Sequence, residues 1–215
     1  MGALKGGLSA RRYQVMGELP SSFQDDYIDK LNQNAFRDAL TAVHKEERLG
    51  WVQVHNLLDT EFDDVNVWLY QQFATFSMRV DKKVIPATLF RAMLQKRQQV
   101  WCKANNRERV PFTVKAELKE ALELELLEKT LPRVTIVDVV WNTTEGWVLF
   151  NSHSAAQSDR FRKLFHRTFG FILQPFTPLD FVADLPEVAA RLLAAGSTDL
   201  RSVPEGEQHE MGGET

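Results

Sequence analysis

The chain has 215 residues, of which 44% are hydrophobic, and this is enough to bury a core in one large domain or two small ones. Its formal net charge of −3 argues against a protein that is basic throughout, as many nucleic-acid and membrane-surface binders are. The single cysteine, Cys102, excludes an intramolecular disulfide and a zinc site built on cysteines. No apolar run approaches the roughly 20 residues that span a bilayer, so we expect a cytoplasmic protein with no membrane contact.

The N-terminal third of the chain predicts one helix among short strands. Segments rich in β-formers predict strands at Leu8–Val15, Gly50–Val54 and Phe73–Val80. Between the first two strands, Ser21 and Gln24 have the spacing of a capping box, which opens a helix. Apolar residues at every fourth position predict the buried face of this helix, namely Phe23, Tyr27 and Leu31.

Two long helices are predicted in the middle of the chain. Pro86 begins the first, which runs to about Lys103 and ends in the polar residues 104–107. The second spans roughly Thr113 to Leu131 and is closed by Pro132. Its leucines form two stripes rather than one, so we expect the helix to pack on two sides, within the domain or against a second copy.

The last third predicts a hairpin, a helix, a strand and a short helix. Their ranges are Val134–Trp141 with Gly146–Asn151, Ser154–Phe169, Phe171–Phe176 and Pro186–Ala195. Ser154 and Gln157 form a second capping-box pattern, and Gly170 ends the longer helix. Because the strands are grouped and linked by hairpins, we expect an α+β fold with a mostly antiparallel sheet and long central helices. We predict one domain over residues 1–195, with a helical segment at 82–133, and a disordered tail at 196–215.

The charges are unevenly distributed. Residues 82–119 contain 10 Lys and Arg but only two acidic residues, Glu108 and Glu117. The segments on both sides of the basic helical segment 82–133 are net acidic. An overall charge of −3 therefore does not exclude a nucleic-acid partner, because a local basic surface can supply the field that attracts it.

Basic side chains recur on helix faces. On the first long helix they lie opposite the apolar arc, except for Arg97, which falls inside it and is expected to snorkel or to lie at a subunit contact. Such stripes either form a solvated face or neutralise phosphates along a nucleic-acid backbone. The candidate DNA-binding residues are Lys82, Lys83, Arg91, Lys96, Arg97, Lys103, Arg107, Arg109, Lys115, Lys119, Arg160, Lys163 and Arg167.

Motifs of catalysis are not found in the sequence. It has no Gly-rich phosphate loop, no nucleophile elbow and no histidine pair with metal spacing, so we predict no catalytic residue, no metal and no cofactor. One alternative is a metal-dependent nuclease, since carboxylates in the loop 59–64 could bind Mg²⁺: Asp59, Glu61, Asp63 and Asp64. A third interpretation is a protein-interaction module whose basic face binds an acidic partner.

Several features between about Lys82 and Leu179 occur together in a known family. They are the basic helix after Lys82-Lys83-Val84-Ile85-Pro86, the helix that ends at Leu131-Pro132-Arg133, the strands Val137–Trp141 and Gly146–Leu149, the turn Ser152–Ser154, and the helix that reaches Phe169-Gly170. With Gly6–Pro20 and Gly50-Trp51-Val52, this pattern resembles the shorter members of the RdgC family, which are bacterial DNA-binding proteins associated with recombination.

The resemblance implies a function without catalysis. Members of the family bind DNA with little sequence preference and form ring-shaped homodimers whose positive central hole encloses the duplex. They also limit the loading or action of the RecA recombinase. We therefore expect a homodimeric, nucleoid-associated protein that binds the backbone of double-stranded DNA. Some members are labelled exonucleases, which no motif supports here. The chain is shorter than the long members, and this bears on ring closure more than on DNA binding.

Overall fold

A computed structural model describes residues 9–19, 24–37 and 47–195. The chain divides into two compact units, residues 1–175 and residues 176–215, and each is described by itself. The predicted domain 1–195 covers the first unit and part of the second. A single domain over these residues stays a prediction. Two predictions lie outside the described residues: the capping box at Ser21 with its neighbour Phe23, and the tail 196–215.

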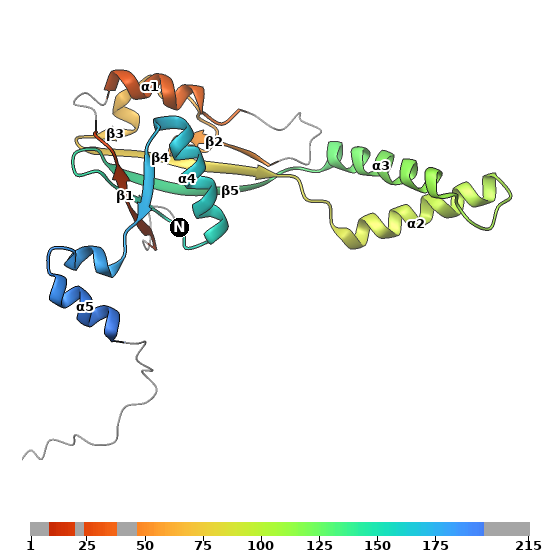
Figure 1. The fold of residues 1–215 in the computed structure, drawn as a ribbon. Coiled ribbons are helices and arrows are strands. Elements are labelled where there is room, and N and C mark those ends of the chain that lie inside the picture. Colours follow the sequence, from red (N-terminus) through yellow and green to blue (C-terminus); the bar gives the residue numbers. More distant parts are fainter. Residues whose placement is uncertain (1–8, 20–23, 38–46, 196–215) are drawn as a thin grey trace, which may run out of the picture. The chain divides into compact units, whose positions relative to one another are not determined.

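One curled antiparallel sheet organises the first unit, as Figure 1 shows. Its seven described strands are β1 (Arg11–Met16), β2 (Arg48–Val52), β3 (Leu69–Tyr70), β4 (Phe73–Lys82), β5 (Arg133–Asn142), β6 (Trp147–Phe150) and β7 (Ile172–Pro175). Their order is β2-β4-β5-β6-β1-β7, and β3 pairs with β4 at the end that β2 leaves free. Together with the five α-helices of the described residues, this antiparallel sheet confirms the predicted α+β fold.

Two helices cover one face of the sheet. These are α1 (Gln24–Gln33) and α4 (Ala155–Phe169), and both contribute to the same core cluster. The core is aromatic: Phe161 of α4 stacks on Phe150 of β6 with ring centroids 4.3 Å apart, and Trp141 of β5 lies 5.0 Å from both Phe165 and Phe169. Tyr27 and Leu31 are buried as the spacing predicts. Large rings packed at these distances fix α4 firmly on the sheet.

Strand β4 is buried on both faces rather than on one. Its alternating pattern predicts a strand with one solvated side, but every residue from Ala74 to Asp81 is buried. The polar residues face a second set of partners: Ser77 Oγ donates to Asp138 Oδ1 at 2.7 Å, and Thr75 Oγ1 donates to the Trp68 carbonyl at 3.1 Å. Hydrogen bonds to side chains and loop backbone therefore replace water on this face.

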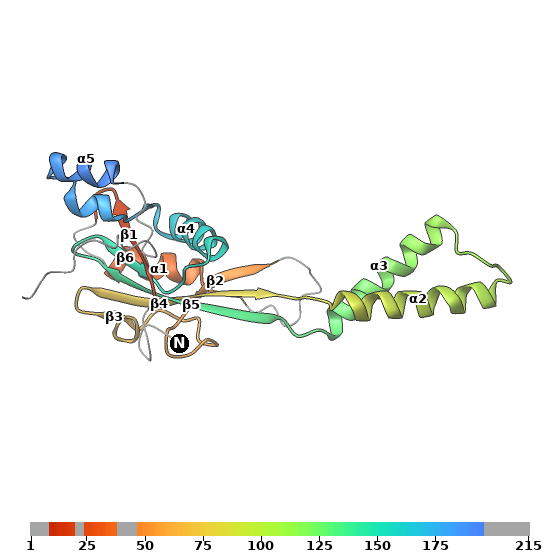
Figure 2. The ribbon, with the colours of Figure 1, turned by 90° about the horizontal axis from the view of Figure 1, so that it is seen from below.

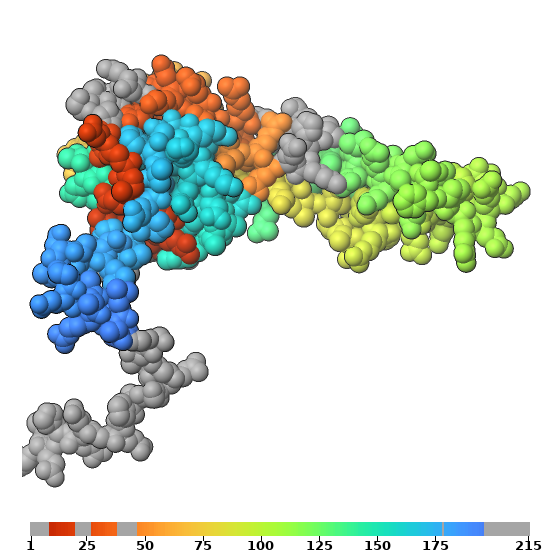
Figure 3. All heavy atoms as spheres, in the orientation of Figure 1, coloured from red at the N-terminus to blue at the C-terminus, as the bar shows by residue number. Residues whose placement is uncertain are grey.

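The ends of β4 and β5 continue into a helical hairpin. Lys82 pairs with Arg133 at the end of the strand ladder, and between them lie α2 (Ala87–Ala104) and α3 (Phe112–Lys129), as predicted to within a few residues. Figures 1 and 2 show from two sides that these helices lie beyond the end of the sheet, and Figure 3 shows them as a protrusion. We call residues 84–132 the arm.

The arm has almost no core. Leu122 and Leu127 are the only described residues of α2 and α3 that are buried, and the apolar arc predicted for α2 contains none. Each of the two predicted leucine stripes of α3 contains one buried residue, while Leu124 and Leu131 are 48% and 80% exposed. The arm is therefore held by contact between its two helices and is not part of the sheet's core cluster.

The ends of α4 follow the predicted signals in part. Gly170 ends the helix with a φ of 82°, a conformation that favours glycine, and its N–H donates to the His166 carbonyl. The Ser154 side chain accepts from the Gln157 N–H, but the reciprocal bond of a capping box is missing. The reason is that the Ser154 N–H donates to Ser152 Oγ at 3.2 Å instead.

The second unit is small. Its described elements are the short 3₁₀ helix Pro178–Val182 and α5 (Pro186–Ala194), which confirms the predicted helix at 186–195. Thr177 and Asp180 form a complete capping box at the 3₁₀ helix, and the rings of Phe176 and Phe181 meet edge to face at 4.7 Å. None of the described helices in either unit is both long and apolar enough to cross a membrane.

Candidate nucleic-acid interface

The far half of the arm concentrates the positive charge. The chain leaves the sheet along α2, turns at residues 105–111 and returns along α3 (Figure 1), so residues 96–119 form the end of the arm. This stretch has seven basic residues against Glu108 and Glu117, whereas the returning part of α3 has four glutamates between 120 and 128. The basic segment found in the sequence is therefore gathered at one end of a projecting element.

Seven of the predicted residues on the arm expose their side chains to solvent. Among the described residues none of them has an ion pair with a carboxylate. They are Arg91, Lys96, Lys103, Arg107, Arg109, Lys115 and Lys119. Solvated and unpaired cations of this kind are free to exchange water and counterions for phosphate oxygens.

A polar groove lies at the end of the arm. It has a volume of about 570 Å³ and lies between the C-terminal half of α2 and the start of α3. Three cations line it, Lys103, Arg109 and Lys115, together with the amides of Gln95, Gln98 and Gln99 and one carboxylate, Glu108. Cations with neutral donors and acceptors suit contact with a nucleic-acid backbone, whose oxygens need hydrogen bonds but carry no sequence information.

Two predicted DNA-binding residues, one on the arm and one directly before it, have partners within the protein. The Arg97 guanidinium forms an ion pair with Glu125 of α3 across the hairpin. Lys83 is buried, and its ammonium donates to the Leu127 carbonyl at 2.8 Å. The Arg97 pair joins the two helices of the arm, and the Lys83 bond joins α3 to the residue that precedes the arm. Their primary role in this structure is to hold α2 and α3 in place.

The other predicted residues lie on the sheet and its covering helix. Lys82 is the exposed last residue of β4. Arg160, Lys163 and Arg167 lie on α4, away from the arm (Figure 1). The structure therefore distributes the predicted residues over two places, the arm with its base and the outer face of α4.

The predicted acidic loop does not gather its carboxylates. Asp59 and Asp64 accept hydrogen bonds from backbone N–H groups two residues later, and Asp63 Oδ1 accepts from the Asn32 amide at 2.6 Å. Among the described residues no three His, Cys, Asp or Glu side chains are placed to hold a metal ion. The carboxylates of this loop fix its conformation, and the geometry gives no support to the nuclease alternative.

Comparison with known proteins decides the family. A model of the family described as "Putative exonuclease, RdgC" matches residues 10–201 of the 215. The chain belongs to the RdgC family. The match covers the sheet, the arm, α4 and α5, and so extends beyond the stretch on which the resemblance was based. No curated protein matches the sequence. The RdgC description names an exonuclease, but the described residues contain no cluster that would supply such chemistry with a metal.

The sequence of this RdgC chain did not reveal which residues lie opposite the three basic residues of α4. Arg37, Glu47 and Arg48 line the same cavity as Arg160, Lys163 and Arg167. More than 100 residues separate the two groups, as for Glu47 and Arg160. Only the pairing of β2 with β4 and the packing of α4 bring them together, so no local pattern could have revealed them.

Proposed function

We propose that the protein binds the backbone of double-stranded DNA, without sequence preference, through the far half of the arm. The observation that carries this proposal is a set of seven exposed basic side chains on a projecting hairpin of an RdgC-family chain, all but Arg91 in its far half and none with a carboxylate partner among the described residues. An arm outside the sheet's core can approach a duplex without steric conflict from the sheet. Phosphate contacts dominate such binding, so we expect the affinity to fall steeply with salt.

The test measures the salt dependence of binding to a duplex of arbitrary sequence. Single charge reversals at Lys96, Lys103 and Arg107 are compared with Arg191→Glu, a matched reversal on α5. Each arm variant should weaken binding and lower the slope of log K against log salt by about 1. Arg191→Glu should leave both unchanged. Absence of binding at low salt, or arm variants that bind like the wild type, would remove the proposal.

Sequence independence is tested in the same assay. Two duplexes of equal length and unrelated sequence should bind with affinities that agree within a factor of about 3, since no base contact distinguishes them. A single strand of the same length is the comparison for strand preference. Binding to one sequence more than about 100-fold above the other would indicate base readout and contradict the proposal.

We also propose that the protein is a homodimer. Support comes from the uncovered apolar surface of the arm, where Val100 is 60% and Leu124 48% exposed, and from an apolar groove of about 520 Å³ that includes Met93, Trp101 and Leu118. Sedimentation of the wild type should give twice the chain mass, and Val100→Glu should lower that mass at equal concentration. A wild type that sediments as a monomer at micromolar concentration would contradict this proposal.

The cellular role follows from occupancy of the duplex. A protein that covers the DNA backbone competes with the RecA recombinase for the same DNA surface. We therefore expect this protein to be cytoplasmic and associated with the nucleoid. A strand-exchange assay tests this: wild-type protein should inhibit the reaction, and the Lys103→Glu variant should inhibit less at equal concentration. Equal inhibition by both would show that the arm is not the cause.

A further inference from the structure

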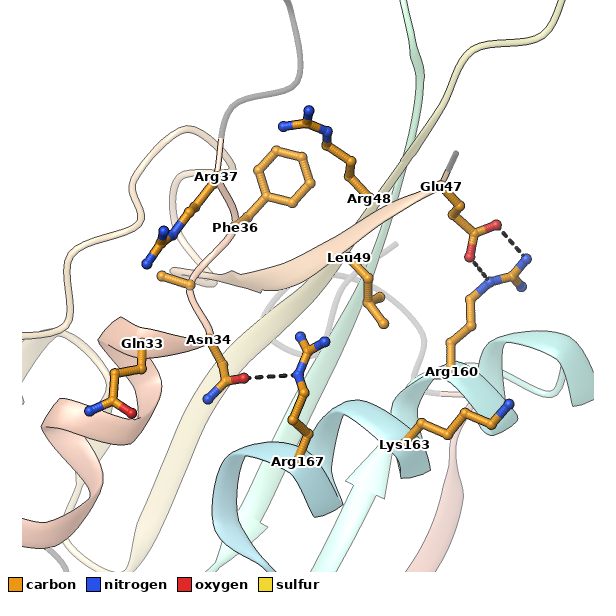
Figure 4. A pocket seen from close by; sticks show the side chains of 11 residues that line it. Gln33, Asn34, Phe36, Arg37, Glu47, Arg48, Leu49, Arg160, Lys163 and Arg167 are labelled. Carbon is orange, nitrogen blue, oxygen red and sulfur yellow. Dashed lines mark hydrogen bonds and ion pairs between the residues drawn. The ribbon is translucent and has the colours of Figure 1, made fainter. Parts of the chain in front are cut away.

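A second cationic cavity lies on the first unit, distinct from the arm. Its volume is about 680 Å³, and three segments form its walls: the residues that follow α1, the start of β2, and one face of α4. Figure 4 shows the side chains around it. Basic residues dominate the described part of the lining, in which Glu47 is the one carboxylate; the cations are Arg37, Arg48, Arg160, Lys163 and Arg167.

A close backbone approach builds one wall. The segment that follows α1 runs beside β2 as a parallel bridge: the Phe36 N–H donates to the Trp51 carbonyl at 2.8 Å, and the Trp51 N–H donates to the Asn34 carbonyl at 3.0 Å. This approach requires glycine at position 50, because a Cβ there would lie 2.4 Å from Phe36 Cα. Backbone pairing therefore fixes Asn34 beside α4.

Only one of the basic groups is neutralised by the carboxylate. Arg160 donates two hydrogen bonds to Glu47, the second at 2.7 Å. The hydrogen bond from Arg160 lowers the pKa of Glu47, and the same bond raises the pKa of Arg160. This pair contributes no net charge, so the positive charge on which the proposal rests is that of Lys163 and Arg167.

One of those side chains is held at the cavity wall by a hydrogen bond, and a second lies near it. Arg167 donates from Nε to Asn34 Oδ1 at 2.9 Å, which holds its guanidinium against the cavity wall, as Figure 4 shows. Lys163, one helical turn earlier on α4, is exposed and lies beside the Arg160–Glu47 pair (Figure 4). Within the described residues neither has a carboxylate partner.

We propose that this cavity binds a phosphate group, and the proposal does not depend on DNA binding by the arm. Like charges gathered in one concave site repel one another, and an anion with several oxygens relieves that repulsion. A guanidinium matches two phosphate oxygens at once, while a lysine ammonium adds a point charge, so Arg167 and Lys163 form a complementary pair of donors. The phosphate belongs either to the end or backbone of a nucleic acid or to a free nucleotide.

The first experiment uses inorganic phosphate and the full chain. Melting temperature is followed as phosphate replaces chloride at constant ionic strength, and the rise gives an apparent dissociation constant. We expect the double variant Lys163→Gln with Arg167→Gln to bind phosphate about tenfold more weakly, since it loses the two charged donors. The matched control is Arg162→Gln, an exposed cation of α4 that does not line the cavity.

A variant with the opposite expected sign sharpens the test. Glu47→Gln removes the single carboxylate and releases Arg160 into the cavity, so phosphate binding should become tighter than in the wild type. The proposal would be overturned if phosphate raised the melting temperature of the wild-type protein no more than chloride does. It would also be overturned if all the variants responded alike, because the effect would then be nonspecific.

The source of the phosphate is found with three further probes. They are a nucleoside monophosphate, a 5′-phosphorylated oligonucleotide and the same oligonucleotide with a 5′-hydroxyl. A preference for the phosphorylated end that Lys163→Gln with Arg167→Gln abolishes assigns the cavity to nucleic-acid ends. Tighter binding of the monophosphate than of either oligonucleotide assigns it to a free nucleotide. Lys103→Glu should not alter the phosphate response, which separates this proposal from the one for the arm.

Discussion

Arg79 is the residue on which the second face of the sheet depends. It is 6% exposed, and its guanidinium donates to the Asp81 carboxylate from Nε at 2.9 Å and from Nη2 at 2.7 Å. Its Nη1 donates to the Leu57 carbonyl at 3.0 Å, and the charge lies 4.1 Å from the centre of the Phe36 ring. Residues i and i+2 of a strand share a face, so Arg79 and Asp81 pair within β4. The contacts of Arg79 with Leu57 and Phe36 attach two loops to this face.

Loss of the carboxylate should destabilise the protein strongly. Asp81→Asn leaves the Arg79 charge buried without its counterion, and we expect the free energy of unfolding to fall by about 3 kcal/mol. Urea denaturation measures the change. The exposed Asp159→Asn on α4 is the control and should change stability by less than about 0.5 kcal/mol. A fall for Asp81→Asn no larger than that of the control would contradict the assigned role.

Glu47 makes stability depend on pH in acid. Its folded-state pKa is lowered below 4.5 by the hydrogen bond from Arg160. A lowered pKa contributes stability that is fully present above the unfolded value and is lost as the pH falls through the folded value. The contribution is about 1 kcal/mol or less, since the pair is partly solvated.

The measurement is urea unfolding of wild type and Glu47→Gln between pH 7 and pH 3. The difference in free energy of unfolding between them should be constant near neutral pH and should shrink below about pH 4.5. Glu187→Gln on α5 serves as control. A difference that is the same at pH 7 and pH 3 would show that the charge of Glu47 contributes nothing.

At the scale of elements, the arm is the least stabilised described part of the first unit. Its helices are as long as predicted, but only Leu122 and Leu127 are buried, and the ion pair Arg97–Glu125 joins half-exposed groups. Elements with few buried apolar contacts open locally at lower free energy than the core. In α4, by comparison, six residues are buried. The reason is that α4 packs on the aromatic face of the sheet, whereas α2 and α3 pack on each other, outside the core cluster of the sheet.

Hydrogen exchange should distinguish the arm from the sheet. We expect amides of α2 and α3 to exchange faster than those of β4 and β5, and Leu122→Ala to remove the remaining protection of the arm without changing that of the sheet. The exposed Leu131→Ala is the control. Loss of protection throughout the first unit in Leu122→Ala would mean that arm and sheet unfold together.

At the scale of the whole chain, the arm is an insertion at the end of a strand ladder. Lys82 and Arg133 are direct partners in the antiparallel pairing of β4 with β5, so the two strands could be joined by a tight turn. The described arm contributes no residue to the core cluster of the sheet. A net charge of −3 coexists with a basic arm because the acidic residues lie mainly elsewhere in the sequence.

Replacement of residues 83–132 by Asn-Gly should therefore leave the sheet folded. This dipeptide forms the two-residue turn that antiparallel strands prefer. We expect a cooperative unfolding transition and wild-type near-ultraviolet circular dichroism from the core aromatics, with duplex binding reduced at least about 100-fold. The phosphate response of the second cavity should persist. Retained duplex binding would place the DNA interface outside the arm.

The sequence by itself determined the elements and where the charge lies along the chain. Apolar periodicity, Pro86 before α2, Pro132 after α3, and Gly170 are local signals, because a helix begins, ends and buries one face according to its own residues. The basic run 82–119 and the resemblance to the RdgC family were visible in the same way, and the family is confirmed.

Only the tertiary structure decided which charges stand free and which are used inside the protein. Arg97 and Lys83 belong to the same basic run as Lys103, yet their partners, Glu125 and Leu127, come from the opposite helix. The second cavity joins Glu47 to Arg160 over a separation of 113 residues. Such pairings depend on strand order and helix packing, which are properties of the whole fold and leave no periodic trace in the sequence.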